Sequence, residues 1–167
     1  MKPIFQTKFG APGGNCFAAC IASVFELDSA EDVPNFCYDT PDGKDWMEAA
    51  SNWCRERFGF GLFTVRAPEG ADYDEQARYM RNFFARSHAY MICGVKTTRG
   101  VLHAVIFRDG KLVHDPYPGG SAIVGRVVDF TVFFPIDPVA ARASTTFACP
   151  QMVPDNPSQR HSADVSA

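Results

Sequence analysis

The sequence lacks both a long apolar run and a cluster of charge of one sign. No stretch approaches the ~18 consecutive apolar residues that a membrane-spanning helix needs. The opening residues MKPIFQTKFGAPGG have a lysine but no long apolar segment behind it, which makes them a poor signal peptide. The net charge is −3, and no basic run offers a surface for phosphates. We therefore expect a cytoplasmic protein that binds neither a membrane nor nucleic acid.

Patterns typical of metal sites and disulfide scaffolds are also missing. There is no C-x-x-C pair and no Cys/His pair at zinc-finger spacing, so the sequence predicts no metal and no cofactor. The 167 residues are enough to bury a core without disulfide bonds. Because no secretory signal is apparent, we expect the thiols to be reduced. The six cysteines are Cys16, Cys20, Cys37, Cys54, Cys93 and Cys149.

The residues that are present change from helical to strand-like patterns along the chain. Apolar residues at helical spacing predict three helices, over 16–27, 42–59 and 72–87. Runs of β-branched and aromatic residues predict strands over 61–67, 89–97, 101–116 and 125–136. The 101–116 run contains Asp109-Gly110, a tight hairpin signal. Helices followed by an antiparallel sheet are typical of an α+β domain.

Cys16 lies where the Gly/Pro-rich turn GAPGG becomes the first predicted helix, with Asn15 as the expected N-cap residue. The positive end of a helix and its free N–H groups stabilise a thiolate. A nearby imidazolium lowers a thiol pKa further. The alternative is that Cys16 only packs, as we expect for Cys20 one turn later. Cys16 is therefore the candidate nucleophile.

The hairpin LHAVIFRDGKLVHDP brings a histidine and a carboxylate together. With the turn at its centre, residues whose numbers sum to about 219 face each other, which places Asp115 beside His103 on the adjacent strand. A one-residue slip would turn His103 to the other face. An Asp bonded to one ring nitrogen fixes the tautomer of a histidine. His88 is the alternative base, and His114 is expected to face away from the site. A thiol, a base and an orienting carboxylate predict nucleophilic catalysis.

The segment Q…GGNCFAAC, followed far downstream by HAVIFRDGKLVHDP, resembles the papain-like cysteine peptidases. It is most similar to the bacterial branch that removes double-glycine leaders in bacteriocin export, and to small proteins of this class in bacteriophages and bacteria. The resemblance covers residues 4–34 and 88–120. It implies a papain-like fold in which a central N-terminal helix packs on an antiparallel sheet. The peptidase domain would span 1–138, and a C-terminal extension over 139–167 would be partly disordered.

The positions that match the family pattern are Gln6, Cys16, Cys20, His103, Asp115 and Pro116. The resemblance implies that the Gln6 amide and the Cys16 backbone N–H hold the oxyanion. It also implies location in the bacterial host cytoplasm if a phage encodes the chain. The residue after Cys16 is Phe17, where the exporter peptidases usually have glycine, so the leader substrate does not carry over.

Three functions fit these residues. The first is a cysteine peptidase or isopeptidase that hydrolyses an amide bond of a peptide or protein through a thioester. The second is an amidase or transglutaminase-like acyltransferase with the same triad. The third is a catalytically inactive binding module.

Overall fold

A computed structural model of the chain describes residues 1–10, 13–40, 45–67, 75, 78, 88–121 and 123–143. The helices are α1 (Cys16–Val24), the 3₁₀ turn η1 (Ala30–Asp32), α2 (Phe36–Asp39), α3 (Trp46–Phe58) and α5 (Pro138–Ala143). The strands are β1 (Phe60–Arg66), β2 (Tyr90–Thr97), β3 (Leu102–Arg108), β4 (Lys111–His114) and β5 (Ile123–Pro135). The described residues thus form an α+β fold, which confirms the coarse fold class.

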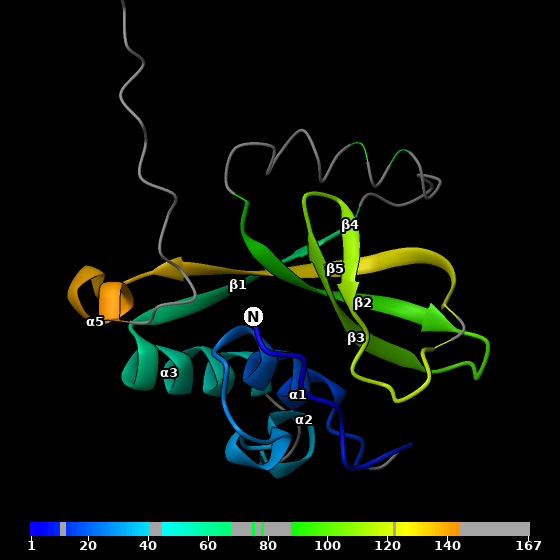
Figure 1. Cartoon of the computed structure of the whole chain (residues 1–167), viewed down its shortest axis with the longest axis horizontal. Coiled ribbons are helices and arrows are strands. Elements are labelled where there is room, and N and C mark those ends of the chain that lie inside the picture. The colour runs from blue at the N-terminus through cyan, green and yellow to red at the C-terminus, as the bar shows by residue number, and fades with distance from the viewer. Residues whose placement is uncertain are drawn as a thin grey trace, which may run out of the picture.

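The five strands form one antiparallel sheet in the order β1-β5-β2-β3-β4 (Figure 1). β5, with 13 residues, is the longest strand and pairs with both β1 and β2. The last strand of the sheet in chain order therefore joins the first strand to the others.

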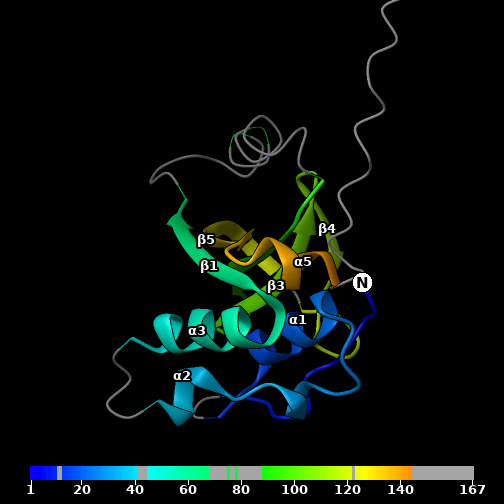
Figure 2. The same ribbon diagram turned by 90° about the vertical axis from the view of Figure 1, so that its left-hand side faces the viewer.

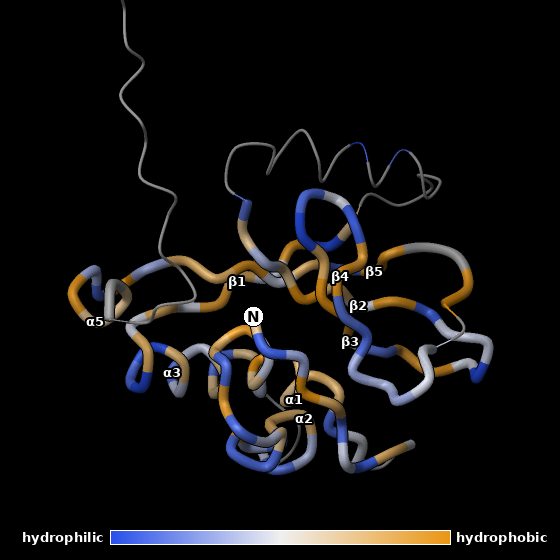
Figure 3. The backbone as a smooth tube through the Cα atoms, in the orientation of Figure 1, coloured by the Kyte–Doolittle hydropathy of each residue, from blue (hydrophilic) through white to orange (hydrophobic). Residues whose placement is uncertain are grey.

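Helices α1, α2 and α3 lie on one side of the sheet (Figures 1 and 2). α1 packs against β3 and β2, while α3 packs against β1. Every residue of α1 after Cys16 is buried, from Phe17 to Val24. A helix that is apolar nearly all round has to be enclosed on all sides, as the sequence predicts for this one. Figure 3 shows the resulting concentration of hydrophobic residues in α1 and the strands.

The two faces of β3 contribute to two separate hydrophobic clusters. Ala104 and Ile106 pack in the cluster that contains α1, whereas Val105 and Phe107 belong to a second cluster. This alternation is the period of two expected of any strand, in which successive side chains point to opposite faces of the sheet.

The β3–β4 hairpin closes at the predicted turn, where Asp109 (φ +52°) and Gly110 (φ +73°) are both left-handed. The predicted register holds next to the turn, where Arg108 pairs with Lys111. It then shifts by one residue, so that Ile106 pairs with His114. No local signal in the hairpin sequence predicts this irregularity, and Asp115 lies just beyond the end of β4.

The helix ends show how far local signals reach. α3 ends at Gly59, which adopts φ +76° as the predicted stop residue. α1 begins at the predicted residue but ends at Val24, three residues before the predicted end at residue 27. The predicted 72–87 helix falls outside the described residues except Glu75 and Arg78, which are both helical.

The chain continues in the core beyond residue 138. α5 follows β5, and its Ala141 is 6% exposed within the same cluster as α1. The rest of the expected C-terminal extension, residues 144–167, lies outside the described part of the chain. None of the described helices has the length and apolar character needed to cross a membrane.

Candidate active site

Cys16 is the first residue of α1, and its side chain is half-buried. Asn15 occupies the N-cap position, where its carbonyl accepts the N–H of Ala19 at 2.9 Å. The structure confirms Asn15 at the predicted N-cap position, but its side chain makes no capping hydrogen bond to the helix. Asn15 Oδ1 instead accepts the backbone N–H groups of Thr7 (3.0 Å) and Lys8 (2.9 Å). Asn15 therefore closes the preceding loop and leaves the N–H groups of the first turn of α1 available to the Cys16 sulfur.

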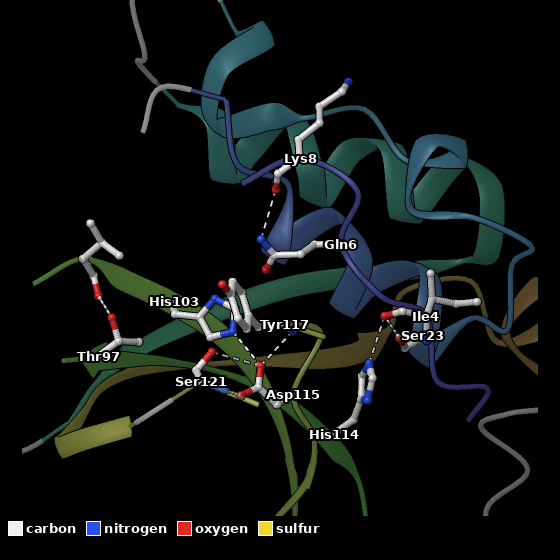
Figure 4. A network of polar contacts seen from close by, with 11 residues as sticks. Ile4, Gln6, Lys8, Ser23, Thr97, His103, His114, Asp115, Tyr117 and Ser121 are labelled. Carbon is white, nitrogen blue, oxygen red and sulfur yellow. Dashed lines mark hydrogen bonds and ion pairs between the residues drawn. The ribbon is translucent and has the colours of Figure 1, made fainter. Parts of the chain in front are cut away.

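His103, at the start of β3, lies against Asp115 as the sequence predicts. Its Nε2 is 2.7 Å from Asp115 Oδ1, and both side chains are largely buried, with 4% and 11% exposed (Figure 4). An ionised carboxylate only accepts hydrogen bonds, so Nε2 carries the hydrogen in this contact. The other ring nitrogen, Nδ1, is then left for the Cys16 thiol.

Asp115 is fixed by three donors in the loop that follows β4. Its Oδ1 accepts the N–H of Tyr117 at 2.9 Å and the Ser121 hydroxyl at 3.2 Å, while its Oδ2 accepts the N–H of Ser121 at 2.5 Å. Burial alone would raise the pKa of Asp115, but the bonds from His103, Ser121 and Tyr117 outweigh it and lower that pKa. The carboxylate is therefore charged and pinned in place beside the imidazole.

The electrostatics of Cys16 and His103 favour transfer of a proton from sulfur to nitrogen. Burial raises the pKa of the Cys16 thiol, but hydrogen bonding to His103 and to the backbones of Ala104 and Phe17 lowers it below its ordinary value. Burial lowers the pKa of His103, whereas its bonds to Cys16 and Asp115 raise it overall. The two shifts bring the thiol and the imidazole toward a thiolate–imidazolium pair.

The other described cysteines have the opposite character. Burial raises the pKa of Cys37 to about 11 and that of Cys54 to about 12, and it also raises the pKa values of Cys20 and Cys93. All five described cysteines are free thiols, as expected from the sequence, while Cys149 lies outside the described residues. Cys16 is the member of this set whose pKa is lowered.

Gln6 is buried, with 6% exposed, so it is not a solvated residue of a loose N-terminal segment. Its backbone N–H donates to the Pro116 carbonyl at 2.9 Å, which ties it to the residue after Asp115. Its side-chain Nε2 donates one hydrogen to the Lys8 carbonyl at 3.0 Å. Its Oε1 is buried and has no hydrogen-bond partner among the described residues. In Figure 4 the side-chain amide of Gln6 points toward His103 and Tyr117.

His114 and Ser23, for which the sequence predicts no such role, hold this segment in place. His114 Nε2 donates to the Ile4 carbonyl at 2.9 Å, and the Ser23 hydroxyl accepts the Ile4 N–H at 2.9 Å. Ile4 is bound to β4 through His114 and to α1 through Ser23. These bonds restrict the position of Gln6, which follows Ile4 by two residues. Ser23 carries no local signal for this role. His114 was expected to face away from the site, and its bond goes to Ile4 rather than to His103 or Asp115.

His88, the alternative base, lies elsewhere. Its Nδ1 is 3.0 Å from Asp109 Oδ2, at the turn that ends β3, whereas His103 stands near the beginning of that strand. The structure therefore brings together Cys16, His103 and Asp115, and leaves His88 at the opposite end of the hairpin.

The described residues contain no group of three or more His, Cys, Asp or Glu side chains placed to hold a metal ion. The chain has no significant match among protein-family models, curated proteins or solved structures. The fold itself defines an α+β protein, and any function has to be argued from the chemistry of the site.

Proposed function

We propose that the protein is a papain-like cysteine hydrolase that cleaves a peptide or isopeptide bond. The observation that carries the proposal is the order of groups at the site. A thiol with a lowered pKa at a helix N-terminus contacts an imidazole whose Nε2 is held by a buried carboxylate. This order supplies the nucleophile, base and orienting group of acyl transfer.

The first half of the reaction forms a thioester. His103 Nδ1 accepts the proton of the Cys16 thiol, and the thiolate attacks the carbonyl carbon of the scissile amide. The resulting imidazolium is stabilised by Asp115. As the tetrahedral intermediate collapses, the C–N bond breaks and His103 donates its proton to the leaving amine.

The developing oxyanion needs hydrogen-bond donors, each of which can be worth ~3 kcal/mol. The Cys16 backbone N–H at the start of α1 is one candidate. The second is the Gln6 amide, which has one N–H left after its bond to Lys8. The burial of Gln6 and its tie to Pro116 support this role, since both restrict where the amide can go.

The second half of the reaction releases the acyl group. His103, neutral again, removes a proton from a water molecule, which attacks the thioester carbonyl. The C–S bond then breaks, and the proton returns to the sulfur. In an acyltransferase an amine would attack the thioester in place of water. The products therefore show whether water or an amine accepts the acyl group.

The test combines thiol labelling with cleavage of a peptide library derived from digested proteins. In folded wild type, iodoacetamide at pH 6.5 should modify Cys16 first, and the library should be cut at defined bonds. Cys16→Ala should abolish cleavage. The matched control is Cys37→Ala, because Cys37 is also half-buried but has a raised pKa, and it should cleave like wild type. Labelling of Cys37 before Cys16, or no Cys16-dependent cleavage with or without added amine, would reject the proposal.

A further inference from the structure

Tyr117 stands beside the proposed triad and is fixed to it by the backbone. Its N–H donates to Asp115 Oδ1 at 2.9 Å. Its ring meets the His103 imidazole edge-on, with the ring centres 6.4 Å apart (Figure 4). The backbone of Tyr117 is therefore anchored by the same carboxylate that orients His103, and its ring lies beside the imidazole.

A cation lies on the Tyr117 ring. The guanidinium of Arg99 is 4.1 Å from the centre of the ring, which is a close cation–π contact. Arg99 belongs to the turn between β2 and β3, and the buried Thr97 holds this turn. Thr97 Oγ1 donates to the Val101 carbonyl at 3.1 Å, and its own carbonyl accepts the Gly100 N–H at 2.9 Å. The charge thus has a defined place next to the site.

Arg99 has no carboxylate partner among the residues that the structure describes. The lysines of the N-terminal segment differ in this respect, since Lys8 pairs with Glu31 at 3.1 Å and Lys2 with Asp28 at 2.8 Å. In a chain of net charge −3, an unpaired guanidinium at the site is a local positive feature on an acidic background. Its planar fork is suited to two hydrogen bonds with a carboxylate.

An apolar surface adjoins this cation. Phe9 packs edge-on against Tyr117, with ring centres 5.6 Å apart, and 53% of Phe9 remains exposed. Aromatic rings beside a site favour apolar ligand groups.

From these contacts we infer that Arg99, Tyr117 and Phe9 form a substrate subsite that binds a carboxylate next to an apolar group. The inference rests on the proposed function and adds the class of substrate to it. The Arg99 guanidinium is 4.1 Å from the centre of the Tyr117 ring, and that centre is 6.4 Å from the centre of the His103 ring. The sum of these two distances is therefore the upper limit on the separation of the guanidinium and the imidazole. An extended peptide advances about 3.4 Å per residue, so the carboxylate belongs within about three residues of the scissile bond. An Asp or Glu side chain supplies such a group, and so does a nearby C-terminus.

The first experiment profiles cleavage by the full chain. The probes are peptides that the wild type cuts, remade with Glu or Gln within three residues of the bond, and with a free or an amidated C-terminus. The wild type should prefer the Glu member or the free acid. Arg99→Gln should reduce the ratio of kcat/KM values within a pair by about tenfold, as expected for loss of a charge-assisted hydrogen bond. Arg99→Lys should reduce it less, because the charge remains.

Arg57→Gln is the matched control. Arg57 also stacks on an aromatic ring, at 5.3 Å from Trp53, but it belongs to α3. This variant should keep the wild-type ratio. The Glu/Gln pair and the acid/amide pair together identify which source of the carboxylate the subsite prefers.

A second experiment does not depend on turnover, because its probes are short apolar peptides of fixed sequence, made in Glu/Gln and free-acid/amide pairs whether or not the wild type cuts them. The Glu and free-acid peptides should slow alkylation of Cys16 by iodoacetamide more than their neutral partners do, and Arg99→Gln should remove that difference. Cleavage without a carboxylate preference, or a preference that survives in Arg99→Gln, would overturn the subsite and leave the proposed hydrolase intact. Arg99-dependent protection without cleavage would retain the carboxylate site and reject the hydrolase. If neither preference nor protection appears, the subsite is wrong.

Discussion

His103 has two ring nitrogens, and each has a different task. Nε2 is held at 2.7 Å by Asp115, which is itself fixed by Tyr117 and Ser121. Nδ1 is thereby presented to the sulfur of Cys16. The bond to Asp115 sets both the tautomer and the direction of the ring, so the reactivity of Cys16 should depend on a residue that does not touch the substrate carbonyl.

His103→Ala should slow alkylation of Cys16 near pH 6.5 several-fold, because hydrogen bonding to His103 lowers the pKa of the thiol and so raises its thiolate fraction. The rate is measured by mass spectrometry of the Cys16 peptide after timed exposure to iodoacetamide. His88→Ala serves as the control, since His88 bonds Asp109 at the far end of β3 and should leave the rate unchanged. The reverse pattern would show that His88 acts on the thiol.

α1 and the loop before it form one unit through Asn15. The side chain of this residue, 2% exposed, accepts the N–H groups of Thr7 and Lys8 and donates to the Thr7 hydroxyl at 3.0 Å. Gln6 precedes the clamp directly, and Cys16 follows it directly. The clamp therefore helps to set the distance between the proposed oxyanion donor and the nucleophile, which are separated by nine residues along the chain.

Asn15→Ala should destabilise the fold by about 2 kcal/mol, because it removes the acceptor of two partly buried N–H groups, those of Thr7 and Lys8. It should also reduce turnover more than it reduces Cys16 alkylation, since alkylation develops no oxyanion. Thermal unfolding and the two rates test this. Asn35→Ala is the comparison, because Asn35 binds the Gly13 carbonyl of the same loop at 3.0 Å without touching residues 7 and 8. Equal effects of the two variants on turnover would remove the special role of Asn15.

Some of this arrangement can be predicted from the sequence, because the signals are local. Asp109-Gly110 defines the turn, and counting outward from it places Asp115 beside His103. The shift between Ile106 and Phe107 has no such signal, since an irregularity in pairing depends on what both faces of the strand pack against. The prediction that Asp115 lies beside His103 holds despite this shift, because Asp115 belongs to a loop whose conformation its own hydrogen bonds fix.

Contacts that join distant segments are beyond a reading of one sequence. Ile4 and His114 are 110 positions apart, and their bond is to a backbone carbonyl, which every residue has. Asn15 is a good N-cap residue by its local pattern, yet its side chain accepts hydrogen bonds from the N–H groups of Thr7 and Lys8 rather than from the helix. Likewise α5 begins with Pro138, a favourable first residue of a helix, but the burial of Ala141 depends on where β5 ends.

The molecule as a whole encloses a charged pair between its helices and its sheet. His103 and Asp115 are largely buried, so their charges contribute to stability in a pH-dependent way. The lowered pKa of Asp115 gives stability above the unfolded carboxyl value of about 3.9, lost as the pH falls through the folded value. The raised pKa of His103 gives stability below about 6.5, lost as the pH rises through the folded value.

The melting temperature of wild type should therefore exceed that of Asp115→Asn most strongly near pH 5–6, because the pKa of Asp115 is lowered and that of His103 is raised. The excess should shrink toward pH 3 and toward pH 9. Calorimetry across this range measures it. Asp137→Asn is the control, because Asp137 accepts the N–H groups of Val139 and Ala140 at the start of α5 and has no described contact with a histidine. A difference that grows steadily into alkaline pH would mean that the pair is not charged as argued.

The place of β5 in the sheet bears on how the protein is made. β5 is the last of the five strands of the sheet in chain order, yet it stands between β1 and β2 and pairs with both. A ribosome delivers Cys16 before it delivers His103, the loop to Ser121 and β5. Until then the thiol has neither its base nor a closed sheet above it. Synthesis therefore makes the thiol before it makes the histidine and the backbone groups of β3 that lower the pKa of Cys16 in the folded protein.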